Sequence, residues 1–302
     1  EPETHTFTQT KGHTISYCIY GVAGDTDPPP PTIFYFHSHP SSRYEAALLH
    51  PTAQRHGLRI VAPDRPGMGE SPLDRSRRLL DWPADMLALA DHLDTRRFGV
   101  VGTSGGGPYV LACCLRLPRA RLAGAGVVCG LFPLKLGTSG MMWETRLMLW
   151  VAGWAPSLVA LGLDFALGKV ARDREHPEAF EAAMAKAMES RPEVDRAVIQ
   201  ENAGGFRDAM LENFREALKH GSQGAAYEAK LFSGDWGFKL EDVKMAEGTL
   251  VLWHGEKDVN VPVAMAQKAA GLLDGAELRL SPDEGHISLP VNKTDEIMET
   301  MK

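Results

Sequence analysis

A serine set between glycines is the most reactive feature of this 302-residue sequence. Residues 102–106 read Gly-Thr-Ser-Gly-Gly, directly after the apolar run 98–101 and ahead of the helix-like run 109–115. A sharp turn from a strand into a helix strains the residue at its apex and leaves no room for side chains two positions away. Ser104 therefore has the setting of a nucleophile, and the amide of Gly105 is directed where a carbonyl oxygen would gain charge.

An acid and a base follow Ser104 in the order Ser, Asp, His. An unassisted hydroxyl is a poor nucleophile at neutral pH, so it needs an imidazole to take its proton and a carboxylate to orient that imidazole. Asp258 lies in the loop after the apolar run 249–254, and His286 lies in the loop after the alternating run 276–281. The three residues are therefore predicted to act together as nucleophile, acid and base.

Alternating strand and helix patterns predict the elements that place these side chains. Strands that alternate with helices form a mainly parallel sheet covered on both faces, and ligands of such sheets bind at the carboxyl ends of the strands. All three candidate residues follow predicted strands at that edge. A helix is expected at 83–93, and the expected strands are 4–10, 14–20, 32–36, 58–62, 98–101, 122–129, 249–254 and 276–281.

Four motifs in this order make the chain resemble an α/β-hydrolase. Besides the serine turn, they are Asp-Arg-Pro-Gly-Met-Gly-Glu-Ser at 64–71, the run 255–258 followed by Pro262, and Gly-His at 285–286. The resemblance covers most of the chain. It implies a mainly parallel eight-stranded α/β sheet with helices on both faces, an inserted helical cap, and catalysis by the serine, aspartate and histidine named above.

Other polar residues near these motifs are expected to have lesser roles. His254 is an alternative base, but the Gly-His loop is the better match to the family. Glu256 is an alternative acid, but the spacing to Pro262 favours Asp258. Asp64 and Arg65 are expected to hold a turn beside the oxyanion loop rather than to act on substrate.

A fifth motif departs from the family pattern. Where the family shows His-Gly-x-Pro after its first central strand, this chain has His37, Ser38, His39 and Pro40. By alignment, the amide of His39 is the second oxyanion donor, beside that of Gly105. Ser38 replaces a glycine and tolerates positive φ less well, so the local backbone path is in question. The side chains of Ser38 and His37 are predicted to contact substrate.

His37 and His39 also form a pattern that can begin a metal site. Two alternate residues of an extended segment point to opposite faces, although a loop can bring both to one ion. Nothing like an eightfold strand–helix repeat accompanies the pair, as a metal-dependent barrel would require. We therefore expect neither a metal nor another cofactor.

The stretch 131–240 is expected to form a helical cap between core segments 1–130 and 241–302. Strand signals stop there, and prolines interrupt a helical periodicity. A small cap cannot bury all of its large apolar side chains, so we expect an apolar pocket, with Trp143 and Met142 as substrate-binding residues. The full set is Met141, Met142, Trp143, Trp150, Trp154, Phe165, Phe206, Phe214, Phe232 and Trp236.

The segment from Leu147 to Leu163 has no charged residue over 17 positions. A bilayer span needs about 20 apolar residues, and Pro156 interrupts this one. Two cap helices joined near Pro156 are therefore expected, and membrane contact is not. A lid that rests on a lipid surface is the alternative.

The composition indicates which binding partners and which cellular compartment to expect. The hydrophobic content of 44% suits a globular enzyme, and a net charge of −7 argues against nucleic-acid binding. The four cysteines show no Cys-x-x-Cys spacing, which favours a reducing, cytoplasmic setting. A leader removed from a chain that begins at Glu1 is the alternative. The sequence does not indicate an oligomeric state.

These features predict a serine hydrolase that cleaves an ester, thioester or lactone bond in a hydrophobic small molecule through an acyl-enzyme. In the family that the chain resembles, epoxide and haloalkane hydrolysis use an aspartate in place of the serine. Carbon–carbon bond hydrolysis or a biosynthetic cyclisation by the same three residues is one alternative. A small-molecule receptor that keeps the three residues without turnover is another.

Overall fold

The computed structural model describes residues 3–9, 12–24, 27–202 and 205–302. Its strands are β1 (His5–Thr8), β2 (Thr14–Gly21), β3 (Thr32–Phe36), β4 (Arg59–Pro63), β5 (Phe98–Thr103), β6 (Leu122–Val128), β7 (Leu250–Gly255) and β8 (Ala276–Ser281). They form one eight-stranded sheet in the order β1-β2-β4-β3-β5-β6-β7-β8. β2 pairs antiparallel with β1 and β4, and the pairings from β4 through to β8 are all parallel. The predicted mainly parallel α/β sheet is confirmed.

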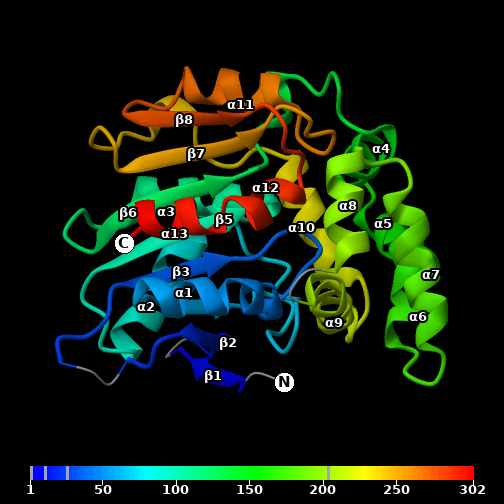
Figure 1. Cartoon of the computed structure of the whole chain (residues 1–302), viewed down its shortest axis with the longest axis horizontal. Coiled ribbons are helices and arrows are strands. Elements are labelled where there is room, and N and C mark those ends of the chain that lie inside the picture. The colour runs from blue at the N-terminus through cyan, green and yellow to red at the C-terminus, as the bar shows by residue number, and fades with distance from the viewer. Residues whose placement is uncertain (1–2, 10–11, 25–26, 203–204) are drawn as a thin grey trace.

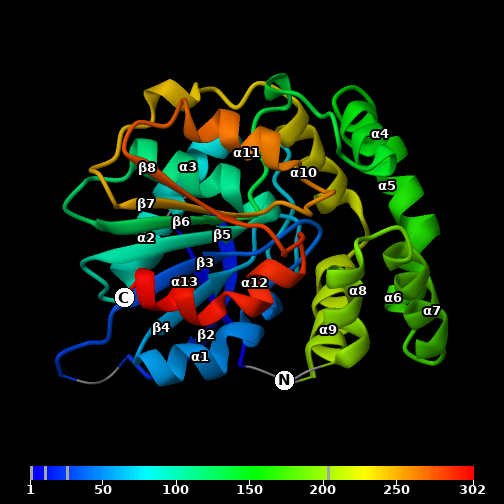
Figure 2. The ribbon, with the colours of Figure 1, turned by 45° about the horizontal axis from the view of Figure 1, so that its top comes forward.

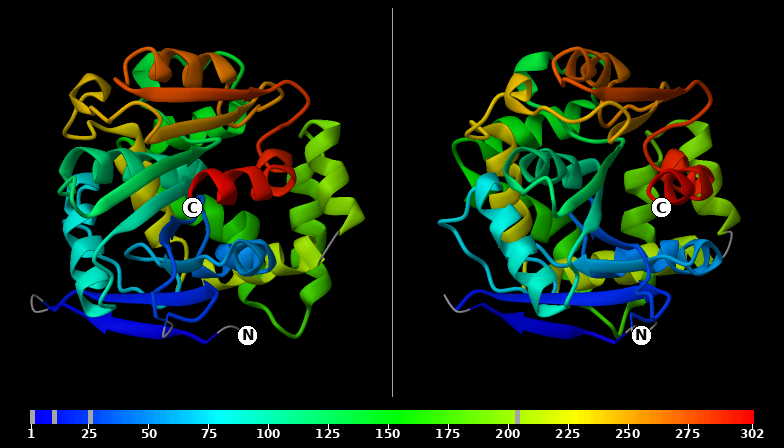
Figure 3. Two further views of the ribbon diagram at one scale, coloured as in Figure 1. Left: turned by 60° about the vertical axis from the view of Figure 1, so that its left-hand side comes forward. Right: turned by 90° about the vertical axis from the view of Figure 1, so that its left-hand side faces the viewer.

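The central strands are buried along their whole length. Every residue of β3, β5 and β7 is buried, as expected for parallel strands with helices on both faces. The N-terminal strands lie at one edge of the sheet and β8 lies at the other (Figure 3). Of the turn expected between β1 and β2, positions 10–11 lie outside the described residues.

Helices cover both faces of the sheet (Figure 2). One face packs against α2 (Trp82–His92), α3 (Gly107–Arg116) and α11 (Val263–Ala270), whose apolar side chains join the larger core cluster. The other face packs against α1 (His50–His56), α12 (Ser288–Asn292) and α13 (Thr294–Thr300). Because α12 begins just after His286, the packing of this short helix fixes where that histidine lies.

Between β6 and β7 the chain leaves the sheet and forms a run of helices, called here the insertion. These helices lie beside the carboxyl ends of the strands (Figure 1). Several of them share an apolar cluster of their own. They are α4 (Trp143–Ala152), α5 (Pro156–Leu163), α6 (Lys169–Arg172), α7 (Pro177–Met188), α8 (Glu193–Glu201), α9 (Phe206–Leu218) and α10 (Gln223–Ser233).

The uncharged segment of the insertion is divided between two helices. α4 ends at Ala152 and α5 begins at Pro156, where proline supplies a residue already restricted to helical φ. Neither helix is long enough to cross a bilayer. Among the described residues, no helix combines the length and the hydropathy that a membrane span requires.

Candidate active site

The serine turn has the strained geometry that its glycines predicted. Ser104 has a φ of 52°, one of the few positive values at a non-glycine residue in the described chain. A Cβ at Gly102 would lie 2.6 Å from the carbonyl oxygen of Gly106, and one at Gly106 would lie 2.2 Å from that of Phe36. Side chains at these two positions would therefore collide with backbone. The turn lifts Ser104 between β5 and α3, at the carboxyl edge of the sheet.

A chain of hydrogen bonds joins Ser104 to the two residues predicted to assist it. The Oγ of Ser104 lies 2.9 Å from Nε2 of His286, and Nδ1 of His286 lies 2.7 Å from Oδ2 of Asp258. These residues follow β5, β8 and β7, so the fold brings together segments that are far apart in the sequence. The arrangement suits proton transfer from the hydroxyl to the imidazole.

Hydrogen bonds and the neighbouring histidines favour the ionised form of Asp258. Burial alone would raise the pKa of this carboxyl, but the neighbouring His286, His254 and the backbone hold it below its ordinary value. The amides of Asn260 and Val261 each donate to Oδ1 at 2.8 Å, which leaves Oδ2 for His286. An ionised, fixed carboxylate can orient the imidazole and stabilise its protonated form.

His254 bonds the loop of Asp258, whereas the imidazole that bonds Ser104 is that of His286. Nε2 of His254 lies 2.7 Å from the carbonyl oxygen of Val261, and the side chain is buried. Burial lowers its pKa, which favours the neutral ring. Its position therefore supports the loop of Asp258 rather than proton transfer from Ser104.

The two predicted oxyanion residues lie against each other. A Cβ placed on Gly105 would come within 2.7 Å of the Cβ of His39, so their backbones meet beside Ser104. The ring of His39 points away from this meeting point, with Nε2 2.8 Å from the carbonyl oxygen of Ala225 in α10. The insertion therefore helps to hold the segment that carries the His39 amide.

The serine that replaces a family glycine takes an ordinary backbone conformation. Ser38 is not among the described residues with positive φ, so the strain expected from the substitution is not present. Its amide lies 3.0 Å from both carboxylate oxygens of Glu45, and its hydroxyl donates to the same carboxylate. Ser38 lines the cavity described below, although its hydroxyl is already engaged by protein.

His37 is buried and bound on both sides of its ring. Nδ1 lies 2.8 Å from the carbonyl oxygen of Ser38, and Nε2 accepts from the amide of Arg65. Burial and the nearby Arg65 lower the pKa of His37 well below its ordinary value. His37 does not line the cavity that holds Ser104, in contrast to the predicted substrate contact. Its ring is used to fix the loop that follows β3.

A buried ion pair connects the oxyanion loop to the insertion. Nε and Nη2 of Arg65 donate to the two oxygens of Glu228 in α10, at 2.6 and 2.8 Å, and both side chains are fully buried. The same guanidinium donates to the carbonyl oxygens of His37 and Ser38, at 2.6 and 2.9 Å. Arg65 therefore holds the backbone of the oxyanion loop, while Glu228 balances its charge.

A second buried carboxylate of the insertion holds the loop of His286. Asp195, in α8, is fully buried and accepts from the amides of His286, Ile287 and Ser288, at 3.2, 2.9 and 2.9 Å. A Cβ on Gly285 would lie 2.4 Å from this carboxylate, so glycine permits the close approach. The motifs in the sequence gave no indication of Asp195 or Glu228, because both lie in the helical insertion.

Replacing Asp195 with asparagine is expected to lower kcat for ester hydrolysis by about 10- to 100-fold, with little change in KM. The amide cannot accept from all three backbone N–H groups as a carboxylate does, so the position of His286 is less well fixed. Stopped-flow or steady-state kinetics would measure the changes in kcat and KM separately. The control is Asp208→Asn, an exposed aspartate of the same insertion, which should leave both constants unchanged.

Residues 33–299 match the alpha/beta hydrolase family. The chain belongs to this family. No curated protein matches it in sequence. Among solved structures, the hydrolase is similar to an enol-lactonase from Burkholderia xenovorans LB400, with 16% identity and a TM-score of 0.67 over 98% of this chain and 97% of that one.

Two further structures have the same fold. Epoxide Hydrolase A from Mycobacterium thermoresistibile is 15% identical, with a TM-score of 0.69 over 100% of this chain and 98% of that one. An esterase from Exiguobacterium antarcticum is 14% identical, with a TM-score of 0.64 over 99% and 97% of the two chains. At these identities the likeness shows the fold and not the substrate.

A cavity of about 410 Å³ opens onto Ser104 and His286 of this hydrolase. The sheet side supplies residues that follow β3 and β5, and the insertion supplies residues from α7 to α9. Most of the wall is apolar. Its apolar side chains include Leu48, Leu49, Met188, Phe206, Met210, Phe214, Ile287, Pro290 and Val291.

The cavity wall differs from the predicted substrate-binding set. Trp143 is 68% exposed and Met142 is only partly buried, and neither lines the cavity. α4 and α5 pack on α10 and turn their outer face to solvent, whereas α9 lines the cavity that holds Ser104. Of the large side chains considered in the sequence, only Phe206 and Phe214 line the cavity. The exposed large apolar residues are Trp143, Leu147, Trp150, Trp154, Leu158, Leu161 and Phe165.

The residues around the candidate site do not suit a metal ion. In the described chain, the one close group of metal-binding side chains is Cys129, Asp258 and His286. Burial raises the pKa of the Cys129 thiol well above its ordinary value, whereas a thiol must ionise to bind metal. Both oxygens of Asp258 already accept hydrogen bonds. His37 and His39 use their ring nitrogens on backbone groups instead.

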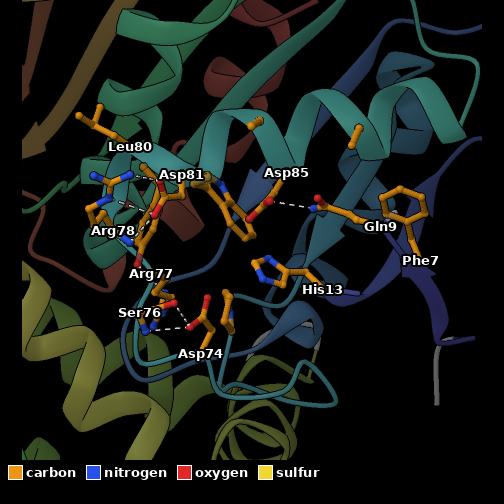
Figure 4. Close-up of a pocket in the computed structure, with 15 residues that line it drawn as sticks. Phe7, Gln9, His13, Asp74, Ser76, Arg77, Arg78, Leu80, Asp81 and Asp85 are labelled. Atoms are coloured by element: carbon orange, nitrogen blue, oxygen red, sulfur yellow. Dashed lines mark hydrogen bonds and ion pairs between the residues drawn. The ribbon is translucent and has the colours of Figure 1, made fainter. Parts of the chain in front are cut away.

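A second cavity, of about 470 Å³, lies beside α2 and the N-terminal strands (Figure 4). Some of its polar side chains pair with each other: Gln9 donates to Asp85 at 2.7 Å, and Arg78 donates to Asp81 at 2.9 Å. None of the three candidate catalytic residues lines it. The candidate catalytic residues Ser104 and His286 line the other cavity.

Proposed function

We propose that this chain is a serine hydrolase that cleaves an ester, thioester or lactone bond in a hydrophobic small molecule. The hydrogen-bond chain from Ser104 through His286 to Asp258 carries the proposal. The family includes other chemistries, since one similar structure is an epoxide hydrolase. Serine at the turn favours acyl transfer, because attack by a serine hydroxyl on a carbonyl carbon gives an acyl-enzyme that water can release.

The proposed reaction begins with attack by Ser104. Nε2 of His286 takes the hydroxyl proton while Oγ bonds to the carbonyl carbon, and the electron pair of the C=O bond moves onto its oxygen. The amides of Gly105 and His39 donate to this oxyanion. The bond to the leaving group then breaks as His286 returns the proton to it. Water then attacks the carbonyl carbon of the acyl-enzyme while His286 takes its proton. The bond to Oγ of Ser104 breaks as His286 returns the proton to that oxygen, and the acid is released.

The cavity supports a hydrophobic substrate of modest size. Its volume of about 410 Å³ is within the range of small-molecule sites, and most of its lining surface is apolar. An esterase and an enol-lactonase among the similar structures are consistent with a carbonyl substrate. The proposed steps use only protein groups and water, so they need no cofactor.

A cytoplasmic location is part of this proposal. All four cysteines, Cys18, Cys113, Cys114 and Cys129, are free and buried. Structural disulfides are typical of oxidising compartments and rare in the cytosol. Fractionation of the native source, with antibody detection of the chain, would test the location.

Labelling with a fluorophosphonate probe tests the proposed chemistry directly. We expect one labelled peptide, containing Ser104, together with sustained turnover of p-nitrophenyl acetate, butyrate and hexanoate. Multiple turnovers, measured as more nitrophenol than enzyme, distinguish a hydrolase from a receptor. A single burst of one equivalent followed by no release would instead support a receptor that is only acylated. Labelling of another serine would contradict the assignment of Ser104.

A further inference from the structure

We propose that Arg191 is a specificity residue that binds a carboxylate carried by the substrate. The inference rests on the proposed hydrolase function and narrows its substrate class to esters, thioesters or lactones that also carry a carboxylate. Arg191 lies just before α8 and lines the same cavity as Ser104 and His286. It is the only arginine or lysine among the described residues of that wall.

The guanidinium of Arg191 is poorly satisfied by the protein. Within the described residues, its only side-chain hydrogen bond runs from Nη1 to the side-chain oxygen of Asn260. Its Nε is buried and has no partner in the described chain. A guanidinium has five N–H donors, and buried donors are nearly always paired in native proteins. Most of the donors of Arg191 therefore lack a protein acceptor.

The surroundings of Arg191 do not neutralise it fully. Burial lowers the pKa of Arg191, and the through-space attraction of Asp195, Asp258 and Glu144 offsets this effect only in part. Asp195 and Asp258 are bound to other donors, as described above. A ligand that brings its own negative charge would remove the remaining cost of burying this cation.

The carboxylates of the cavity wall, unlike most of the donors of Arg191, have hydrogen-bond partners in the protein. Glu45 accepts from the hydroxyl of Tyr35 at 2.6 Å and from the amide of Ser38 at 3.0 Å. Asp295 accepts from Arg55 at 2.9 Å. Both carboxylates therefore have protein donors, while the cation does not have a matching protein acceptor. The hydrogen-bonding groups of this cavity that lack a protein partner among the described residues therefore include donors of the cation.

The positive and negative ends of the cavity lie on opposite sides of Ser104. Arg191 bonds Asn260, which follows β7, whereas Glu45 bonds Ser38, which follows β3. The sheet order places β5 and β6 between those strands. Three strand spacings separate β3 from β7 by roughly 14 Å. A carboxylate at Arg191 can therefore bind without approaching Glu45, while the scissile carbonyl lies at Ser104.

A carboxylate is the anion that fits this geometry. The planar fork of a guanidinium can donate two parallel hydrogen bonds to the two oxygens of a carboxylate. The rest of the cavity is largely apolar, so the remainder of the substrate is expected to be hydrocarbon. The substrate then has an apolar body, one reactive carbonyl and one terminal acid group.

The test compares a neutral ester with two anionic esters of similar size. Phenyl hexanoate is the neutral substrate, monophenyl adipate carries a carboxylate on the acyl side, and para-carboxyphenyl hexanoate carries it on the alcohol side. In Arg191→Gln, kcat/KM should fall about 10- to 100-fold for at least one anionic ester, mainly through KM. The neutral ester should change by less than about threefold. Arg191→Lys should retain part of the preference because it keeps the charge.

Arg196→Gln is the matched control, since this arginine lies five positions further on and outside the cavity wall. It should leave all three substrates unchanged. Equal losses for neutral and anionic esters in Arg191→Gln would overturn the proposal, because they would show a role in folding or in the field around Asp258. Unchanged rates for both anionic esters would overturn it as well.

Binding to an inactive protein separates this inference from the proposed function. Titration calorimetry should show tighter binding of monophenyl adipate or para-carboxyphenyl hexanoate than of phenyl hexanoate to Ser104→Ala. The preference should disappear in the double variant with Arg191→Gln. If the wild type hydrolyses none of the esters but this binding preference is found, the hydrolase proposal fails and the carboxylate site stands. If hydrolysis occurs without the binding preference, the hydrolase proposal stands and the carboxylate site fails.

Discussion

Replacing Ser104 with alanine is expected to reduce the hydrolysis of p-nitrophenyl esters by about 10⁶-fold, to the background rate of the assay. The variant keeps the oxyanion amides and the cavity but removes the atom that bonds to the carbonyl carbon. In the wild type, Nε2 of His286 lies 2.9 Å from Oγ of Ser104. Without this hydroxyl, His286 has no nucleophile to deprotonate at that position, so acyl transfer to residue 104 cannot occur. Initial rates over a range of enzyme concentrations would measure the loss.

The control for this variant is Ser157→Ala, an exposed serine of α5. It should keep full activity and full fluorophosphonate labelling. Thermal unfolding should show that Ser104→Ala remains folded, since alanine is smaller than serine and the turn is held by its neighbours. An unchanged rate in a folded Ser104→Ala protein would remove the basis of the proposed mechanism.

Replacing Arg65 with methionine is expected to lower the free energy of unfolding by about 3–5 kcal/mol. The change leaves the fully buried carboxylate of Glu228 without its two-point partner, and Arg77, 3.5 Å away, gives only partial compensation. It also releases the carbonyl oxygens of His37 and Ser38, so ester hydrolysis should fall even in the folded fraction. Urea unfolding followed by fluorescence would measure the stability.

The double variant Arg65→Met with Glu228→Met separates two effects. One is the loss of the ion pair, and the other is a single charge left buried without its partner. It should be more stable than Arg65→Met alone, because the fully buried carboxylate is then absent, although Arg77 also loses Glu228 as an ion-pair partner. Arg77 would still retain its hydrogen bond to Tyr109. A double variant that is less stable than the single variant would contradict this, because it would show that the contacts of Glu228 with Arg77 and Tyr109 outweigh the cost of burying its charge.

The same pair has a pH signature with a defined sign. Burial would raise the pKa of Glu228, but Arg65 and Arg77 hold it well below the ordinary value of 4.5. A depressed pKa means that the unfolded chain binds the proton more readily, so stability is lost as the pH falls below 4.5 toward the folded-state pKa. In Glu228→Gln this acid-dependent decline should be smaller than in the wild type.

Local patterns were sufficient to predict the sheet and the convergence of Ser104, Asp258 and His286. Each of these residues follows a strand with its own apolar pattern, and parallel strands end at a common edge. The strand 32–36 has the predicted limits, and β7 begins and ends one residue later than predicted. Boundaries shift in this way because the last hydrogen bonds of a strand depend on its neighbours.

The partners supplied by the insertion could not be predicted in the same way. Asp195, Glu228 and Arg191 contact residues that are tens to more than a hundred positions away in sequence. Asp195 and Glu228 lie in helices whose polar residues resemble any solvated face, and Arg191 lies just before one. Trp143 is the opposite case, a residue predicted to bind substrate that does not line the cavity. Its size and position suggested a pocket wall, but only the packing of α4 and α5 on α10 decides which face of a helix meets solvent.

The two buried carboxylates of the insertion have a consequence for heat inactivation. Asp195 fixes the segment of His286, and Glu228 fixes Arg65 beside the His39 segment, so α8 and α10 are parts of the catalytic framework. Loosening either helix would misalign the imidazole or an oxyanion donor while the sheet is still intact. We therefore expect ester hydrolysis to be lost on warming before the strands melt.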